Sequence, residues 1–346
     1  MRIFLTGHLG YLGSVMAARF TEGGHEVTGL DAGYFAECLF GEPGARVREL
    51  RKDLREVNEW DLEGHDAIVH LAALSNDPLG NLNGDWTMAI NHEASVSLAR
   101  MARAVGVPRF LFSSSCIMYG ASTAAEVNEE SPLDPKTVYA QSKVEAERDI
   151  AGLATPEFSP VFLRNGTVYG WSPRLRFDTV LNNLTGAAVA TGRVTIHGDG
   201  SPWRPVVHIE DVARAFLAAL EAPRERLHNQ ALNTAAASAN RQIIDLARAV
   251  VAAVPGARLE CLDAPGADRR TYKANFDKIA RLLPEFRVEW SMERGIEQLV
   301  EQFQRRGLTE AEFTSSRYTR MKWLGGVIEA GRFDGQLRQT APEVAA

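Results

Sequence analysis

Thr6-Gly7-His8-Leu9-Gly10-Tyr11-Leu12-Gly13 is the stretch that decides the fold of this chain. An apolar segment at 2–5 precedes it, and a helical segment at 13–22 follows it. The glycines allow the backbone to turn tightly and to approach a pyrophosphate, whose charge the first N–H groups of the helix would face. The spacing is G-x-x-G-x-x-G rather than G-x-G-x-x-G. The sequence predicts a dinucleotide site with contacts from Gly7, Leu9, Gly10, Tyr11 and Leu12.

An acidic residue at the end of the next expected strand supports this interpretation. Asp31 lies 18 residues after Gly13, where a carboxylate can accept hydrogen bonds from both hydroxyls of an adenosine ribose and would repel a 2′-phosphate. Ala32, Gly33 and Tyr34 follow it, so no arginine is at hand for such a phosphate. An ordinary turn aspartate is the alternative. The pattern favours NAD over NADP as the cofactor.

Two further strand ends are expected to contribute to the cofactor site. Asp53 and Leu54 follow the third strand and would lie near the adenine. Leu71, Ala72 and Ala73 end the fourth strand, and the small residues would let the backbone approach the cofactor. Both could also be ordinary strand ends, and only their combination with the glycine-rich loop indicates a binding role.

Short apolar runs alternate with amphipathic segments through the first half of the chain. Apolar strands separated by helices are typical of a parallel sheet covered on both faces. The expected strands lie at 3–6, 26–31, 46–50, 67–71, 109–113 and 161–163, and the expected helices at 13–22, 89–105 and 138–151. The predicted fold class is α/β, a doubly wound parallel sheet (Rossmann) with a smaller C-terminal α/β domain.

The alternation of apolar and amphipathic segments becomes less regular after Tyr169 and Gly170, where a loop-rich region begins. We therefore expect an NAD-binding domain at 1–168, a substrate-binding domain at 169–308 and a helical C-terminal appendix at 309–346. Within the second domain, the segment 206–220 has the pattern of strand, cap and helix. This segment is expected to return to the first domain.

Tyr139 and Lys143 are four residues apart and share one face of an expected helix. A phenol has a pKa of about 10 and is a poor base near neutrality, but a nearby ammonium favours the phenolate. Tyr139 could then take a hydroxyl proton as hydride leaves the carbon and return it in the reverse step. Ser115, at the end of the fifth strand, would hold the same oxygen. The alternative is a solvated pair that matches the pattern by chance.

Composition excludes several other classes of protein. The 346 residues are 45% hydrophobic and 24% charged, and the net charge of −6 provides no basic field for nucleic acid or an anionic membrane. Cys38, Cys116 and Cys261 show neither metal spacing nor a disulfide pattern, so no metal site is expected. With an N-terminal strand in place of a signal peptide and no long apolar run, the chain is expected in the cytoplasm.

These motifs together resemble the extended short-chain dehydrogenase/reductase family, specifically its nucleotide-sugar epimerase and dehydratase branch. The resemblance covers about residues 1 to 305. Its motifs are the three glycines, 70–73, Asn91, 113–120, Tyr139 with Lys143, 163–164, 168–170, 198–200, Arg204 and 208–211. It implies a Rossmann domain, a smaller domain that binds a nucleoside diphosphate sugar, and a homodimer built from helices of the first domain.

The resemblance also implies roles for individual residues. Ser115, Tyr139 and Lys143 match the catalytic trio, and Asn91 and Ser113 lie in motifs of the cofactor site. The residues expected to bind substrate are Asn165, Asn183, Arg204, Asp268 and Arg269. Arg204 matches an arginine that contacts the diphosphate, which a guanidinium fork suits. A surface ion pair is its alternative.

Three departures from the family pattern bear on the reaction. Dehydratases carry an Asp-Glu pair after the catalytic hydroxyl residue, where this chain has Cys116 and Ile117, so dehydration is disfavoured. Thr167 and Trp171 replace the usual asparagine and proline around Val-Tyr-Gly, and Arg204 is followed by proline and valine. The last two changes alter the expected substrate pocket.

Cys116 has two interpretations. It occupies the position where sugar 3,5-epimerases of this family place a proton-carrying cysteine, and it could shuttle a proton beside a ketone. Alternatively it is a small buried residue that packs behind the strand, which is the interpretation we favour.

The leading hypothesis is an NAD-dependent epimerase of a nucleoside diphosphate sugar, acting by transient oxidation at C4 and return of hydride to the opposite face. The alternatives are an NAD(P)H-dependent ketoreductase of a 4-keto nucleotide sugar and a C3 or C5 epimerase that uses Cys116. A sensor that kept the fold without the chemistry is disfavoured because Tyr139 and Lys143 are both present.

Overall fold

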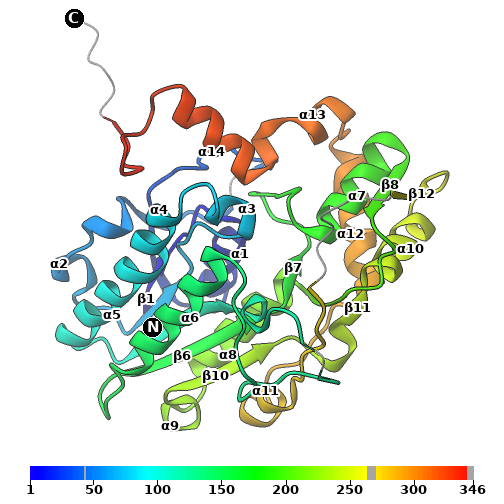
Figure 1. The fold of residues 1–346 in the computed structure, drawn as a ribbon. Helices are drawn as coiled ribbons and strands as arrows, with labels where there is room; N and C mark the ends of the chain where they lie inside the picture. The colour runs from blue at the N-terminus through cyan, green and yellow to red at the C-terminus, as the bar shows by residue number, and fades with distance from the viewer. Residues whose placement is uncertain (43, 123, 263–269, 341–346) are drawn as a thin grey trace, which may run out of the picture.

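The computed structural model describes residues 1–42, 44–122, 124–262 and 270–340. A seven-stranded parallel sheet forms its larger lobe (Figure 1). In order across the sheet, the strands are β10 (Gln230–Thr234), β6 (Ser159–Asn165), β5 (Arg109–Ser115), β4 (Ala67–His70), β1 (Arg2–Thr6), β2 (Glu26–Asp31) and β3 (Arg48–Arg51). The strand order reverses direction between β1 and β4, and the crevice beyond the carboxyl ends at such a point is where ligands bind in this fold.

Alternate side chains of the strands feed two apolar cores, one on each face of the sheet. One core, with Ile3 and Leu5, packs against α1 (Tyr11–Glu22) and α8 (Ile209–Glu221). The other, with Phe4 and Phe110, packs against α5 (Ala94–Ala104) and α6 (Val138–Ala151). The predicted doubly wound α/β fold is confirmed.

The smaller lobe is built around a third apolar core. It contains a three-stranded sheet and a two-stranded sheet, covered by three helices that lie together in Figure 1. These elements are β7 (Thr167–Tyr169), β9 (Trp203–His208), β11 (Asn240–Gln242), β8 (Arg193–His197), β12 (Arg258–Leu262), α7 (Val180–Thr191), α10 (Ile243–Ala253) and α12 (Met292–Arg305). The expected strand, cap and helix at 206–220 is present, because β9 ends at His208, whose side chain caps α8.

Short elements complete the described chain. They are η1 (Leu54–Glu56), α2 (Glu59–Leu62), α3 (Asp77–Gly80), α4 (Gly84–Met88), the π-helical turn η2 (Ala89–Glu93), η3 (Cys116–Tyr119), α9 (Arg224–Leu227), η4 (Ala237–Ala239), α11 (Asp277–Leu282), α13 (Glu310–Thr314), η5 (Ser316–Tyr318) and α14 (Arg320–Glu329). Within the described ranges, no helix has the length and apolar character needed to cross a bilayer.

The six expected strands all occur, but the seventh, β10, was not predicted. Its sequence carries polar residues at Asn233 and Thr234, and these side chains are fully buried. Asn233 satisfies this burial by accepting a hydrogen bond from the Tyr119 hydroxyl at 2.7 Å. A polar sequence of this kind gives no strand pattern by itself.

The turn between β1 and α1 provides a stability prediction. A Cβ atom at Gly13 would overlap the carbonyl oxygen of Gly7, which is backbone and cannot move aside. We expect Gly13→Ala to lower the free energy of unfolding by about 2 kcal/mol or more. Gly325→Ala is the control, because Gly325 lies in α14 with open space around it and should become about 0.5–1 kcal/mol more stable. Equal effects in urea unfolding would contradict the packing of this turn.

Candidate active site

The glycine-rich loop lies at the carboxyl edge of the sheet, between β1 and β4. Gly7 adopts a left-handed conformation with φ of 77° and donates its N–H to Leu30 O at 2.7 Å. A Cβ atom there would stand 2.9 Å from the nitrogen of Ala72. The loop and the end of β4 are thus too close for side chains, which leaves bare backbone around the crevice. This is the cradle that a pyrophosphate requires.

Asp31 is fixed beside this cradle. Its carboxylate accepts hydrogen bonds from the backbone N–H of Leu9 at 3.1 Å and of Gly33 at 2.7 Å. The side chain therefore stands at the end of β2 over the glycine-rich loop, as expected for a residue that binds an adenosine ribose. The residues present fit NAD.

A buried series of hydrogen bonds supports the glycine-rich loop, and the sequence did not predict it. Thr6 Oγ1 accepts from the N–H groups of Leu71 and Ala72, both at 3.2 Å, so its hydroxyl donates to His70 Nδ1 at 2.6 Å. His70 Nε2 then donates to Ser95 Oγ at 2.7 Å. Burial lowers the pKa of His70 to about 3, with the charge of Lys143 acting in the same direction. His70 is therefore a neutral structural link.

Asn91, expected in the cofactor site, lies fully buried in the π-helical turn η2. Its amide donates to Leu74 O at 3.1 Å and to Ser142 Oγ at 3.2 Å, and its oxygen accepts from Leu74 N at 2.8 Å. These bonds tie the loop after β4 to helix α6. Asn91 therefore positions helix α6, which carries Tyr139 and Lys143.

Lys143 is held at the end of β5. Its ammonium donates to Ser113 O at 2.8 Å and lies 4.5 Å from the centre of the Phe112 ring. Only 3% of the residue is exposed. Burial lowers the pKa of Lys143 to about 7, although the charge of Glu147 acts in the opposite direction. The cation is thus desolvated and fixed rather than solvated on a helix surface.

Tyr139 stands one turn earlier on α6, with Ser115 as a hydrogen-bond partner. Burial and the charge of Asp77 raise the pKa of Tyr139 to about 12, while Arg176 and the bond to Ser115 act in the opposite direction. Gly80 makes room for this arrangement, because a Cβ there would lie 2.8 Å from the Cβ of Tyr139. The structure therefore places Tyr139 against Ser115, with Lys143 one turn further along α6.

Arg176 was not predicted as a site residue. It is buried in the loop before α7, where it donates to Asp178 at 2.7 Å and to the hydroxyl and carbonyl of Ser75, both at 3.0 Å. The cluster of arginines after Gly170 was the available signal in the sequence, but the spacing alone did not indicate which one faces Tyr139.

Cys116 lies behind the strand rather than in the crevice. It is fully buried in the core that packs against α1 and α8, and its thiol donates to Arg164 O at 3.1 Å. Burial raises the pKa of the thiol well above its ordinary range. These are the surroundings of a packing residue, and they do not favour the thiolate that proton transfer would need.

The expected substrate residues are placed unevenly. Asn165 donates to Ser113 Oγ at 3.1 Å, and its buried Oδ1 has no hydrogen-bond partner in the part of the chain that the structure describes. Asn183 is exposed on α7 and donates to Phe177 O at 2.9 Å. The Arg204 guanidinium lies 5.8 Å from the centre of the Tyr272 ring. The remaining two residues, Asp268 and Arg269, lie outside the described residues.

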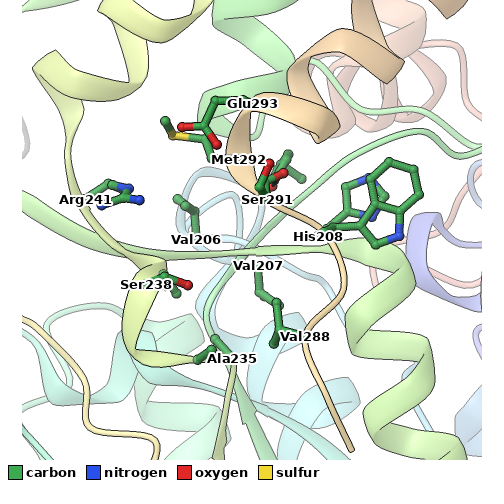
Figure 2. A pocket seen from close by; sticks show the side chains of 14 residues that line it. Val206, Val207, His208, Ala235, Ser238, Arg241, Val288, Ser291, Met292 and Glu293 are labelled. Carbon is green, nitrogen blue, oxygen red and sulfur yellow. Dashed lines mark hydrogen bonds between the residues drawn. The ribbon is translucent and has the colours of Figure 1, made fainter.

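A hollow in the smaller lobe is separate from these residues. It lies beside β9 and the start of α12, where His208 and Trp290 stack with ring centres 4.0 Å apart (Figure 2). None of the predicted site residues lines it.

A dinucleotide cradle with a Ser-Tyr-Lys trio defines an enzyme of the short-chain dehydrogenase/reductase type. A model of the NAD dependent epimerase/dehydratase family matches residues 3–235, and the chain belongs to this family. It is an NAD-dependent enzyme of the nucleotide-sugar epimerase, dehydratase and reductase group.

Two curated relatives illustrate the range of this group. A UDP-glucose 4-epimerase of Mycolicibacterium smegmatis is 30% identical over 235 residues, which cover 63% of this chain and 73% of that protein. A dTDP-4-dehydro-6-deoxy-D-allose reductase of Streptomyces bikiniensis is 30% identical over 274 residues, which cover 72% of this chain and 80% of that protein.

Solved structures extend the similarity. TunA, an NAD-dependent NDP-hexosamine 5,6-dehydratase involved in tunicamycin biosynthesis, superposes with a TM-score of 0.80 at 27% identity, covering 89% of this chain and 99% of TunA. MoeE5, solved in complex with UDP-glucose and NAD, superposes with a TM-score of 0.76 at 26% identity, covering 88% of this chain and 99% of MoeE5.

The burial of Lys143 predicts a pH dependence of stability. The unfolded chain keeps this lysine protonated up to about pH 10.4, whereas the folded, cofactor-free protein releases the proton near pH 7. Between these values the unfolded state binds more protons, so stability rises with pH, and below pH 7 the full cost of burying the charge remains. From pH 7 to 9, the free energy of unfolding of the wild type, measured with urea, should rise by about 2 kcal/mol relative to that of Lys143→Met. Parallel pH profiles of the two proteins would contradict this.

Proposed function

We propose that the protein is an NAD-dependent epimerase of a nucleoside diphosphate sugar that inverts C4 through a transient 4-keto sugar. The observation that carries the proposal is the assembled trio of Ser115, Tyr139 and Lys143, combined with the absence of the dehydratase acid pair, whose place Cys116 and Ile117 take. The UDP-glucose 4-epimerase relative supports the same reaction.

NAD would be held by the glycine-rich loop, Asp31 and the bare backbone at the end of β4, and when bound it accepts a hydride from the sugar carbon and returns it. Lys143 is close enough to Tyr139 in sequence, and fixed enough by Ser113, to stabilise the phenolate.

Tyr139 acts on the sugar hydroxyl. It takes the hydroxyl proton as the carbon is oxidised and gives it back when the alcohol re-forms, so the enzyme ends each cycle in its starting protonation state. Ser115 donates a hydrogen bond to the same oxygen, and Arg176 adds a second positive charge near the phenol. The withdrawal of Tyr139 and Lys143 from water strengthens each of these interactions.

We assign the nucleoside diphosphate to the region around Arg204 and Tyr272 in the smaller lobe. The guanidinium lies 5.8 Å from the centre of the Tyr272 ring, and a planar cation suits a diphosphate. The complex of MoeE5 with UDP-glucose and NAD supports a ligand of this class. We also propose a homodimer that forms through helices of the larger lobe.

The second candidate is a reductase of a 4-keto nucleotide sugar. It is favoured by the relative that reduces a dTDP-4-dehydro sugar, and it uses the same three residues. The two reactions differ in their need for reductant. An epimerase interconverts two sugars with its bound NAD alone, whereas a reductase needs stoichiometric NADH or NADPH and a keto substrate.

Replacement of the phenol tests the catalytic assignment. Tyr139→Phe should lower kcat about 10²–10⁴-fold, because the acid–base step is lost while the ring remains. The NAD content of the purified variant should stay unchanged. Tyr318→Phe is the matched control, since its hydroxyl lies 3.5 Å from Leu39 O, outside the trio, and activity should be retained. Normal turnover by Tyr139→Phe on a panel of nucleotide sugars would contradict the mechanism.

Replacement of the thiol separates C4 inversion from proton-based inversion. Cys116→Ala should leave kcat within about twofold and cost about 1 kcal/mol of stability, because only packing is lost. The product formed by the wild type in deuterated water should carry no deuterium on sugar carbons when analysed by NMR. Loss of activity in Cys116→Ala, together with deuterium beside the oxidised carbon, would instead establish a C3 or C5 epimerase.

A further inference from the structure

The C-terminal residues 320–340, which we call the strap, lie across the carboxyl edge of the large sheet. The strap begins with α14, which Figure 1 shows over α3 and α4, and it continues into a turn that folds back so that Phe333 pairs with Gln339. TunA is matched over 99% of its length by 89% of this chain, so the chain contains residues beyond the fold that the two share.

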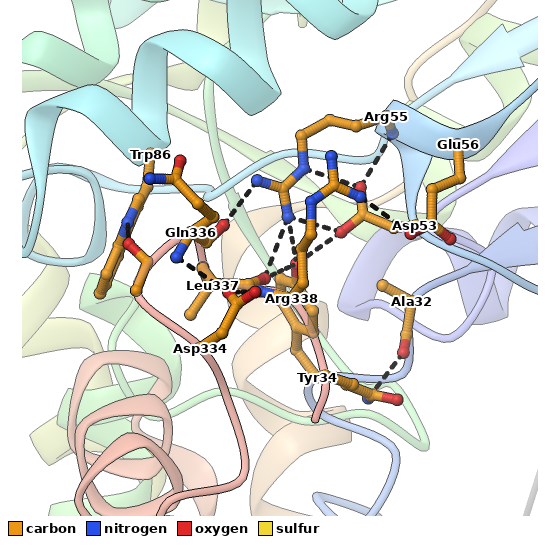
Figure 3. A network of polar contacts seen from close by, with 12 residues as sticks. Ala32, Tyr34, Asp53, Arg55, Glu56, Trp86, Asp334, Gln336, Leu337 and Arg338 are labelled. Atoms are coloured by element: carbon orange, nitrogen blue, oxygen red, sulfur yellow. Dashed lines mark hydrogen bonds and ion pairs between the residues drawn. The ribbon is translucent and has the colours of Figure 1, made fainter. Parts of the chain in front are cut away.

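At the adenosine end of the crevice, the strap is clamped through its backbone (Figure 3). Arg55 donates to Gln336 O at 2.6 Å and to Leu337 O at 3.0 Å. The Tyr34 hydroxyl lies 2.7 Å from the same Leu337 oxygen. Arg55 and Tyr34 come from the segments after β3 and β2, which flank the position expected for the adenosine.

The Asp53 carboxylate is hydrogen-bonded to Arg55 and Tyr34, the two residues of this clamp, and is not free to bind adenine. Its Oδ1 accepts from the N–H and Nε of Arg55 at 2.8 and 2.9 Å, and its Oδ2 accepts from Arg55 Nη2 at 2.7 Å and lies 2.9 Å from the Tyr34 hydroxyl. These four contacts occupy the carboxylate's acceptor positions. The residue expected to bind cofactor directly therefore orients the side chains that grip the strap.

The backbone at the clamp is itself strained. Leu337 has a φ of 54°, in the left-handed region that costs a side-chain-bearing residue about 1–2 kcal/mol. Its side chain is fully buried with Leu324 and Val327 of α14 and with Leu74 and Leu79 from the loop after β4. Strain of this kind persists only where surrounding contacts determine the conformation.

The other side of the strap reaches the active-site loops. The backbone N–H of Arg320 donates to Asp178 at 3.2 Å, and its buried guanidinium donates to Arg174 O at 2.9 Å. Asp178 is the same carboxylate that pairs with Arg176 beside Tyr139. The strap thus contacts the loops that follow β2, β3, β4 and β7.

We propose that the strap closes the dinucleotide crevice and retains NAD through successive turnovers. The crevice lies between the loops of β2 and β3 on one side and those of β4 and β7 on the other, and the strap contacts all four. Dissociation of NAD therefore requires the strap to detach first. The inference rests on the proposed epimerase reaction, in which the same NAD serves every cycle, because a reductase would have to exchange its cofactor at each turnover.

Two variants test the strap while leaving the body of the protein unchanged. Leu337→Asp places a charge in the buried cluster and should expel the terminal segment, and a chain ending at Gly331 removes that segment but keeps α14. NAD-loaded protein would be desalted, and the release of bound NAD followed over time. We expect release at least about tenfold faster from both variants, with unchanged circular dichroism.

Arg332→Ala is the matched control, because it removes an exposed ion pair between the strap and Glu37, with both side chains about half exposed, which contributes little. Its NAD release should equal that of the wild type. Wild-type release rates from both strap variants would overturn the proposal, and so would fast release from the intact chain. The outcome is independent of the sugar assay, so a failure of the proposed epimerase reaction would leave this result readable.

Discussion

The close approach of the glycine-rich loop to the end of β4 is the constraint on which the rest of the structure depends. Gly7 can lie against Ala72 only because neither the loop nor the strand end places a side chain between them. Thr6 and His70 fix this approach from below with hydrogen bonds that leave the imidazole neutral. The bare backbone that results allows a dinucleotide to lie between β1 and β4, with its reactive end over β5 and α6.

Around that end two ionisable side chains are withdrawn from water, which opposes their charged forms. Lys143 is buried with its ammonium on a backbone carbonyl, and Tyr139 is half-buried with its pKa raised. Without cofactor, neither group is in the protonation state that the proposed chemistry needs, since the phenol is too weak an acid and the lysine is near its midpoint. A positive charge beside them is what makes transfer of the proton favourable. The proposed strap would keep this arrangement intact between turnovers.

The local parts of this account could be predicted from the sequence. The strand-loop-helix at 2–22, Asp31 and the helix at 138–151 each depend on neighbouring residues and on regular spacing, and the structure places them as expected. Arg176 and Asp53 show the limit of the approach. Arg176 donates to Ser75, about 100 residues away, and Asp53 orients Arg55, whose distant partner is the backbone carbonyl of Leu337; no periodicity reports such a pairing. The strap itself depends on contacts across about 280 residues.

The ionisation of Tyr139 tests the central claim most directly. The tyrosinate absorbance of the protein, taken as the difference from Tyr139→Phe, can be titrated with and without bound NAD. The account predicts a pKa of about 12 for Tyr139 in the cofactor-free protein and a value lower by at least about two units in the NAD-loaded protein, because the nicotinamide adds a positive charge beside the phenol. An unchanged pKa on loading would show that the phenol does not face the cofactor, and the proposed chemistry would fail.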